Sequence, residues 1–188
     1  MNPILLASAS PRRKQLLEWA EIPFEVIIKC TDESYPPGLS PSETAIHIAR
    51  NKALAIIPQY PQRVVLAADT IVVLGDRIIG KPADRTDAIS ILNDLSGRTH
   101  QVITGVAIMQ GTKERVFADI TEVSFHPLDS EGIEFYVDKY KPYDKAGAYA
   151  IQEWIGVTGI RSVSGDFYNV MGLPVSRVVR SLREFMAD

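Results

Sequence analysis

The order of the segments along this chain predicts an α/β fold. Short apolar runs, typical of buried strands, alternate with segments whose apolar residues recur at helical spacing over the 188 residues. Such alternation is typical of proteins in which helices cover a sheet. No internal repeat, low-complexity tract or long linker interrupts it. The chain is long enough for one substantial core, or for two small lobes that share one.

The composition excludes several classes of protein. With 20 lysines and arginines against 23 aspartates and glutamates, the net charge is −3, whereas nucleic-acid-binding proteins usually carry a basic surplus. The single cysteine, Cys30, cannot form an internal disulfide and fits a reducing compartment. The apolar stretch 3–7 is too short for a signal peptide, and no run approaches a membrane span. We therefore expect a cytoplasmic protein with no membrane or nucleic-acid partner.

The first elements are a strand over 4–7 and a helix over 13–19, which read ILLA and RKQLLEW. A second strand is expected over 21–30, in EIPFEVIIKC. The turn-rich segment TDESYPPGLS, at 31–40, predicts a surface loop.

A second helix begins with strong sequence signals. Ser40 can cap it, Pro41 suits its first position, and Glu43 completes a capping box with Ser40. The segment 43–57 carries an apolar stripe at helical spacing. Lys52 falls off the centre of this stripe.

The rest of the chain continues the alternation. The apolar run over 64–81 is interrupted by Asp69, and Gly75 and Asp76 predict a hairpin or bend. After it we expect a helix over 85–95, strands over 100–110 and 114–125, a helix over 130–140, a glycine-rich stretch over 144–172 and a closing helix over 175–186.

Hydroxyl and guanidinium groups gather where the first strand turns into the first helix. Ser8, Ser10, Arg12 and Arg13 surround a helix N-terminus, which attracts anions through its free N–H groups and partial positive charge. Arginine forks match phosphate oxygens, so these residues could cradle a phosphate. Alternatively, Ser10 caps a surface helix whose first position is Pro11 and whose arginines face solvent. From these residues alone, the capped helix is the simpler interpretation.

Asp69 and Thr70 follow the apolar stretch VVLAA. An ionised carboxylate there is costly unless it is exposed, paired or bound to a metal. Since ligand sites of α/β sheets gather at strand ends, Asp69 is a candidate metal ligand or general base. Lys81, in a loop expected nearby, could join the site. The alternative is an exposed aspartate on a surface strand and a lysine in a turn.

Three further segments carry weaker candidates. Glu33 could be a second metal-binding or water-activating carboxylate, and Lys52 a third phosphate contact; their plainer interpretations are a solvated loop acid and a solvent-facing lysine. In DKAGAYAIQ, at 144–152, Gly147 permits close approach to a planar ligand. Tyr149 could pack against a base, and Gln152 could read the edge of a nucleobase. A tightly packed turn explains the same segment.

Several common catalytic motifs are missing from the sequence. It contains no GxxxxGK[ST] loop, no GxGxxG fingerprint, no HExxH pair and no GxSxG elbow. P-loop, Rossmann, zinc-protease and α/β-hydrolase interpretations therefore lose support.

Taken together, the segments resemble the Maf family of nucleoside triphosphate pyrophosphatases. The resemblance rests on LASASPRR, Glu33, ARNKA around Lys52, AADTIV, GKP, SGRTHQVITGV, DKAGAYAIQ and GIRSVSGDFYNVMGLP. These pieces run in order along nearly the whole chain. Each is weak alone, but this many in sequence are highly specific.

The resemblance implies an elongated α/β fold akin to the inosine triphosphatases. It implies a mixed, twisted sheet flanked by helices, and one domain over 1–188 whose two lobes surround a cleft. It also implies hydrolysis of a nucleoside triphosphate to monophosphate and pyrophosphate, with Mg²⁺ or Mn²⁺ as cofactor. Relatives suggest a homodimer. DKAGAYAIQ, which ends in Gln152, is similar to the branch that acts on dTTP and UTP.

The resemblance also implies a role for each candidate residue. Asp69 matches the proposed proton acceptor. The positions that line the phosphate and metal site are Ser8, Arg12, Arg13, Glu33, Lys52 and Lys81. The positions associated with substrate choice are Arg12, Thr70 and Gln152. We expect Glu33 and Asp69 to hold the metal. The positive charges of Arg12, Lys52 and Lys81 would neutralise charge on the leaving pyrophosphate.

A function of another class is also compatible with the sequence. Some Maf relatives are linked with septum formation and division arrest, so the protein could be a nucleotide-binding regulator. The carboxylates expected at the metal favour the enzyme, because a sensor of nucleotides needs cations but no metal-bound carboxylates.

Overall fold

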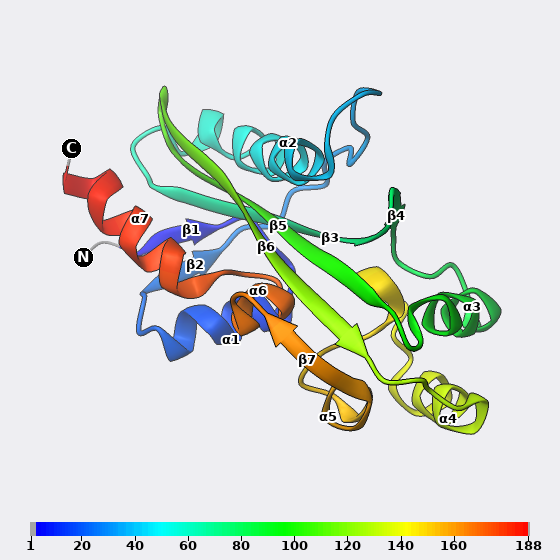
Figure 1. The fold of residues 1–188 in the computed structure, drawn as a ribbon. Coiled ribbons are helices and arrows are strands. Elements are labelled where there is room, and N and C mark those ends of the chain that lie inside the picture. The colour runs from blue at the N-terminus through cyan, green and yellow to red at the C-terminus, as the bar shows by residue number, and fades with distance from the viewer. Residues whose placement is uncertain (1–2, 188) are drawn as a thin grey trace. The chain divides into compact units, whose positions relative to one another are not determined.

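The computed structural model describes residues 3–187 and confirms the α/β fold (Figure 1). Seven strands form one mixed sheet. The strands are β1 (Ile4–Leu6), β2 (Phe24–Val26), β3 (Val65–Leu74), β4 (Arg77–Ile79), β5 (Thr99–Gln110), β6 (Lys113–Phe125) and β7 (Ile160–Ser164). The helices are α1 (Pro11–Trp19), α2 (Pro41–Leu54), α3 (Arg85–Leu95), α4 (Ser130–Tyr140), α5 (Trp154–Gly159), α6 (Phe167–Val170) and α7 (Val175–Ala187), with 3-10 turns η1 (Ile57–Gln59) and η2 (Ala146–Ala148).

The strand order is β2-β1-β3-β5-β6-β7, with β4 paired to β3 beside this path. β1 is parallel to both β2 and β3. The pairs β3–β4 and β6–β7 are antiparallel. The sheet is therefore mixed, as expected, and the bend at Gly75 and Asp76 is a β-hairpin.

Most predicted elements are confirmed, and the strand expected over 21–30 needs correction. β2 covers only Phe24–Val26 of the strand expected over 21–30, because it pairs in register with β1, which is itself only three residues long. The glycine-rich stretch 144–172, for which the sequence predicted no helix or strand, contains η2, α5, β7 and α6. The capping box of α2 is present, with Ser40 and Glu43 each bonded to the backbone of the other.

The chain forms two compact units. Unit 1 contains the residues up to Thr70, Thr104–Asp119 and the residues from Gly172 onward, and unit 2 contains Ile71–Ile103 and Ile120–Met171. The single domain expected over 1–188, with its cleft between two lobes, stays a prediction. Its residues 1, 2 and 188 lie outside the described residues.

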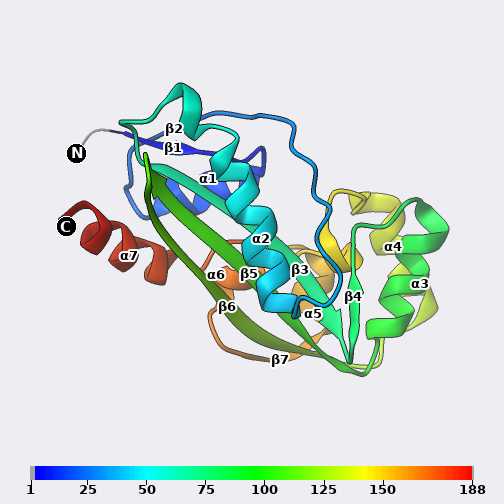
Figure 2. The same cartoon turned by 90° about the horizontal axis from the view of Figure 1, so that it is seen from above.

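In unit 1, α1 and α2 cover opposite faces of the strands around β1 (Figures 1 and 2). Strand side chains alternate between faces, so Leu5 packs with Ala49 and Ala53 of α2 in one buried cluster. α2 and β5 approach so closely that a Cβ at Gly105 would lie 2.2 Å from the carbonyl carbon of Ala45. Glycine at this position therefore lets α2 lie directly against the sheet.

In unit 2, α3 and α4 lie side by side (Figures 1 and 2). Arg85 of α3 pairs with Glu134 and Asp138 of α4. Their apolar faces share a buried cluster with Phe125 and Tyr149. Over residues 3–187, no helix is long and apolar enough to cross a membrane.

Candidate functional site

Arg13 is the buried centre of a hydrogen-bond network in unit 1. The residue is only 9% exposed. Its Nε donates to the carbonyl oxygen of Gly172 over 2.7 Å. Its Nη1 donates to Ser8 Oγ over 3.1 Å, and its Nη2 to Thr70 Oγ1 over 3.0 Å. The guanidinium thus joins the N-terminus of α1 to β3 and to the segment that precedes α7.

Ser10 and Arg12 complete the start of α1. Ser10 is the N-cap, and its hydroxyl accepts a hydrogen bond from the Arg13 backbone N–H. The capped-helix interpretation is therefore correct for Ser10. It is wrong for Arg13, which is buried, while Arg12 is half-buried. Of the two adjacent arginines, Arg13 organises the turn and Arg12 keeps more of its surface toward solvent.

Glu33, Lys52 and Asp69 form a second cluster of unit 1. Lys52 Nζ lies 2.7 Å from Glu33 Oε1 and 2.6 Å from Asp69 Oδ1. The side chains of Lys52 and Asp69 are only 17% and 14% exposed, and that of Glu33 is 52% exposed. The solvent-facing interpretation of Lys52 is therefore wrong. Its ammonium bridges two carboxylates that are 36 positions apart in the sequence.

Asp69 lies in the middle of β3, not at the end of a strand as expected, because β3 continues to Leu74. Asp69 and Thr70 are half-buried, whereas the rest of the strand is buried. The parallel neighbour β1 ends at Leu6, which pairs with Leu66. Asp69 therefore lies beyond the carboxyl end of β1, where parallel sheets place their ligand sites.

The charges of the two clusters act on each other. Burial lowers the pKa of the Arg13 guanidinium, and the Asp69 carboxylate opposes this shift. Arg12 lowers the same pKa and Glu33 raises it, each by a smaller amount. Arginine stays protonated in proteins, so Arg13 is a fixed positive charge within electrostatic reach of both carboxylates.

The two carboxylates suit a hard divalent cation. One oxygen of each carboxylate lies within 2.7 Å of the Lys52 ammonium, which is itself a cation. Mg²⁺ is usually held by one or two carboxylates together with substrate phosphates and water. Among residues 3–187, no group of three or more His, Cys, Asp or Glu side chains could hold a metal by itself. The donor set fits a metal that shares its ligands with a phosphate.

Lys81 and Gln152 belong to unit 2 and are both exposed. Their segments are joined by a hydrogen bond of 3.1 Å from the Gly147 backbone N–H to the Gly80 carbonyl oxygen. Gly147 has φ +72°, and a Cβ there would lie 2.9 Å from Val72 Cγ2. The tightly packed turn is thus confirmed. The convergence of Lys81 and Gln152 with the residues of unit 1 stays a prediction.

A partly buried network holds the segment that carries Gln152. Lys145 Nζ lies 2.8 Å from Asp144 Oδ1 and 3.6 Å from Glu153 Oε1. The Tyr136 hydroxyl donates to Glu153 Oε2 and accepts from the Ala150 backbone N–H. These contacts anchor the backbone on both sides of Gln152.

The full-length comparison with known families agrees with the motifs. A family model described as "Maf-like protein" matches residues 3–185. This chain belongs to the Maf family. The resemblance noted from the sequence is therefore confirmed over nearly the whole chain.

Three curated relatives of this Maf protein carry the same name. The dTTP/UTP pyrophosphatase of Cytophaga hutchinsonii is 50% identical to this chain, over 96% of this chain and 83% of that protein. The dTTP/UTP pyrophosphatase of Parabacteroides distasonis is 49% identical, over 97% of this chain and 95% of that protein. A third, from Bacillus velezensis, is 44% identical over 97% and 96%. A solved structure of the Staphylococcus aureus Ham1 protein is similar with a TM-score of 0.45 and 16% identity, over 66% of this chain and 72% of that one.

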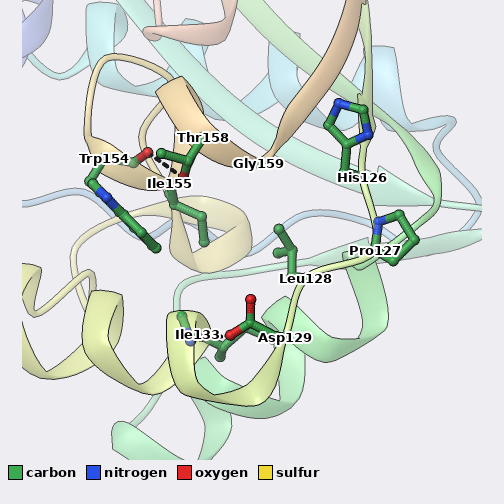
Figure 3. A pocket seen from close by; sticks show the side chains of 10 residues that line it. His126, Pro127, Leu128, Asp129, Ile133, Trp154, Ile155, Thr158 and Gly159 are labelled. Carbon is green, nitrogen blue, oxygen red and sulfur yellow. Dashed lines mark hydrogen bonds between the residues drawn. The ribbon is translucent and has the colours of Figure 1, made fainter.

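Unit 2 contains a pocket between α4 and α5 (Figure 3). Its volume is about 180 Å³. It is lined by the segment before α4, by the first turn of α4 and by α5, including Leu128, Asp129 and Trp154. None of the residues expected to bind substrate or metal lines it.

Sequence reasoning missed two residues of the Arg13 network. Thr104 is fully buried, and its Oγ1 shares a hydrogen bond of 2.9 Å with Thr70 Oγ1. Gly172, at φ +113°, turns its carbonyl oxygen toward Arg13. The sequence signal for Thr104 is that it is the one threonine inside the apolar strand expected over 100–110. The glycine before Leu173 and Pro174 was a weaker signal for the second.

Proposed function

We propose that this Maf protein hydrolyses nucleoside triphosphates to nucleoside monophosphate and pyrophosphate, with a preference for dTTP and UTP and with a divalent metal ion. The observation that carries the proposal is the pairing of two carboxylates with Lys52 beside the Arg13 network. The names of the relatives support the reaction and the choice of pyrimidine nucleotides.

Asp69 is the proposed proton acceptor. Its carboxylate is half-buried on β3, and one of its two oxygens accepts a hydrogen bond from Lys52. The other oxygen can take the proton of a water that attacks phosphorus, which is the work of a general base. The bond between the phosphorus and the bridging oxygen then breaks, and pyrophosphate leaves.

The cationic side of the site would bind the triphosphate. Arg12 has the fork geometry that matches phosphate oxygens. Ser8 accepts hydrogen bonds from Arg13 and from the Ser10 backbone N–H, so its own hydroxyl proton is left for donation to a phosphate oxygen. Lys81 would add positive charge from unit 2. Charge on the leaving pyrophosphate is stabilised by such fixed cations.

Glu33 and Asp69 would hold Mg²⁺ or Mn²⁺. When bound, such an ion polarises phosphate oxygens and makes a coordinated water more acidic. Thr70 and Gln152 are the proposed positions of substrate choice, together with Arg12. This activity would remove modified or excess pyrimidine nucleotides from the nucleotide pool of the cytoplasm. The active protein would be a homodimer.

The replacement Asp69→Asn tests the proposal. We expect the rate of pyrophosphate release from dTTP or UTP in the presence of Mn²⁺ to fall by roughly 10²–10⁴-fold, which is the usual contribution of a general base. Asp76→Asn is the matched control, since Asp76 is an exposed residue of the β3–β4 turn, and it should keep the wild-type rate. Near-normal turnover by Asp69→Asn would contradict the assigned base.

A regulator of cell division is the competing function. Purified protein incubated with dTTP and Mn²⁺ distinguishes the two, because an enzyme forms the monophosphate. Tight binding of the nucleotide without conversion would favour the regulator.

A further inference from the structure

The Lys52 ammonium already satisfies the two carboxylates that would ligate a metal. Its Nζ is within hydrogen-bond distance of Glu33 Oε1 and Asp69 Oδ1, at 2.7 and 2.6 Å. A divalent cation bound by the same two oxygens would compete with the ammonium for one position. Lys52 therefore has to move when such a cation binds.

The cluster has no surplus of negative charge that would call for a metal. Its two carboxylates, Glu33 and Asp69, act with three cations, which are Lys52, Arg12 and Arg13. A divalent cation that entered alone would raise the net charge of this half-buried site from +1 to +3. Like charges repel one another more strongly in a half-buried site than in water, because water is partly excluded there. A polyphosphate that entered with the cation would offset this charge and would offer new acceptors to the displaced ammonium.

We propose that Lys52 is a resident counter-ion that closes the two-carboxylate site to a free divalent cation and opens it to a cation that arrives with a polyphosphate. Lys52 would exchange Glu33 and Asp69 for phosphate oxygens at the moment the metal binds. This inference rests on the proposed function for its metal and its substrate, and it adds an order of binding to that function.

Binding of Mn²⁺ to the nucleotide-free protein tests the inference without any turnover. The loss of the electron paramagnetic resonance signal of free Mn²⁺ reports the bound ion. We expect weak binding to the wild-type protein, and binding tighter by roughly tenfold or more to Lys52→Gln and Lys52→Met, because both variants lack the competing charge. Lys52→Arg keeps the charge and should bind as weakly as the wild type. A dTTP analogue with a methylene group between the α and β phosphorus atoms should bring wild-type binding close to that of Lys52→Gln.

Two controls assign the signal to this site. Lys29 is an exposed lysine of the same unit whose Nζ donates to the Ala55 carbonyl oxygen, so Lys29→Met should bind Mn²⁺ as weakly as the wild type. Addition of Glu33→Gln to Lys52→Gln should abolish the gain. Circular dichroism establishes whether each variant is folded. If Lys52→Met does not fold, the test is made with the polar variant Lys52→Gln.

The inference is overturned if Lys52→Gln binds Mn²⁺ no tighter than the wild type, if Lys52→Arg gains as much as Lys52→Gln, or if the gain survives Glu33→Gln. Its failure is separable from that of the proposed function. If the wild-type protein hydrolyses dTTP but Lys52→Gln does not gain affinity for Mn²⁺, only the proposed role of Lys52 is rejected. If the Lys52 variants show the expected Mn²⁺ affinities but the wild-type protein does not hydrolyse dTTP, only the enzymatic activity is rejected.

Discussion

Arg13 and Gly172, 159 positions apart in the sequence, are joined by a hydrogen bond of 2.7 Å from Nε to the carbonyl oxygen. The same guanidinium donates to Ser8 and Thr70. One side chain therefore ties the first turn of α1 to β3 and to the segment that enters α7. Arg12, its neighbour in the sequence, is half-buried.

Lysine in place of each arginine should separate these two roles. Arg13→Lys keeps the charge, but an ammonium lacks the fork of N–H groups with which the guanidinium bonds three acceptors. The oxygen atoms of Ser8, Thr70 and Gly172 therefore lose donors. We expect the free energy of unfolding to fall by roughly 2–4 kcal/mol, measured by urea denaturation. Arg12→Lys should change stability by only about 0.5 kcal/mol but raise KM for dTTP. Equal stability of the two variants would show that Arg13 has no structural role.

His100 makes the stability of unit 2 sensitive to mild acid. Its side chain is 1% exposed, its Nε2 shares a hydrogen bond of 2.7 Å with the Tyr149 hydroxyl, and its ring stacks on Phe125. Burial lowers the pKa of His100 to about 4 from its ordinary value of 6.5. Between these two values the unfolded chain binds a proton that the folded protein does not.

The free energy of unfolding should therefore fall as the pH drops below 6.5. Since the unfolded state binds more protons in this window, stability rises with pH there, and the loss is complete only below pH 4. Between pH 7 and pH 5 we expect a loss of roughly 2 kcal/mol from this group, measured by urea denaturation at each pH. His100→Gln should remove most of this slope, whereas His126→Gln, at an exposed position, should keep it. A wild-type slope in His100→Gln would contradict the assignment.

The sequence predicted those features that depend on local chemistry. The capping box of α2 and the β3–β4 hairpin follow from residues a few positions apart, and both are present. Asp69 was recognisable because a carboxylate interrupts an apolar run. These signals need no knowledge of tertiary contacts.

The features that the sequence left open depend on distant contacts. Arg12 and Arg13 look equivalent as neighbours, and only Ser8, Thr70 and Gly172 make Arg13 a buried residue. Lys52 falls off the apolar stripe of its helix, which predicted a solvent-facing side chain. The carboxylates that hold it come from a loop and from β3, and no local pattern indicates either contact.

Gln152 offers a clean test of substrate choice because its neighbours are anchored. Glu153 accepts from the Tyr136 hydroxyl, and the Ala150 N–H donates to the same hydroxyl, so the backbone of this segment does not depend on the Gln152 side chain. Gln152 itself is exposed. A replacement there should change its own contacts with a ligand and little else.

Gln152→Glu should weaken the use of dTTP and UTP. The carboxylate loses both N–H donors of the amide and adds a negative charge, and a site built to bond a substrate group discriminates against a mismatch. We expect kcat/KM for dTTP and UTP to fall by roughly 3–10-fold, as for one lost hydrogen bond, with a smaller change for GTP in the same nucleotide panel. Gln62→Glu, at an exposed position of unit 1, is the charge-matched control and should keep the wild-type ratios. Relative rates that do not change in Gln152→Glu would remove Gln152 from the specificity role and leave Arg12 and Thr70 as the candidates.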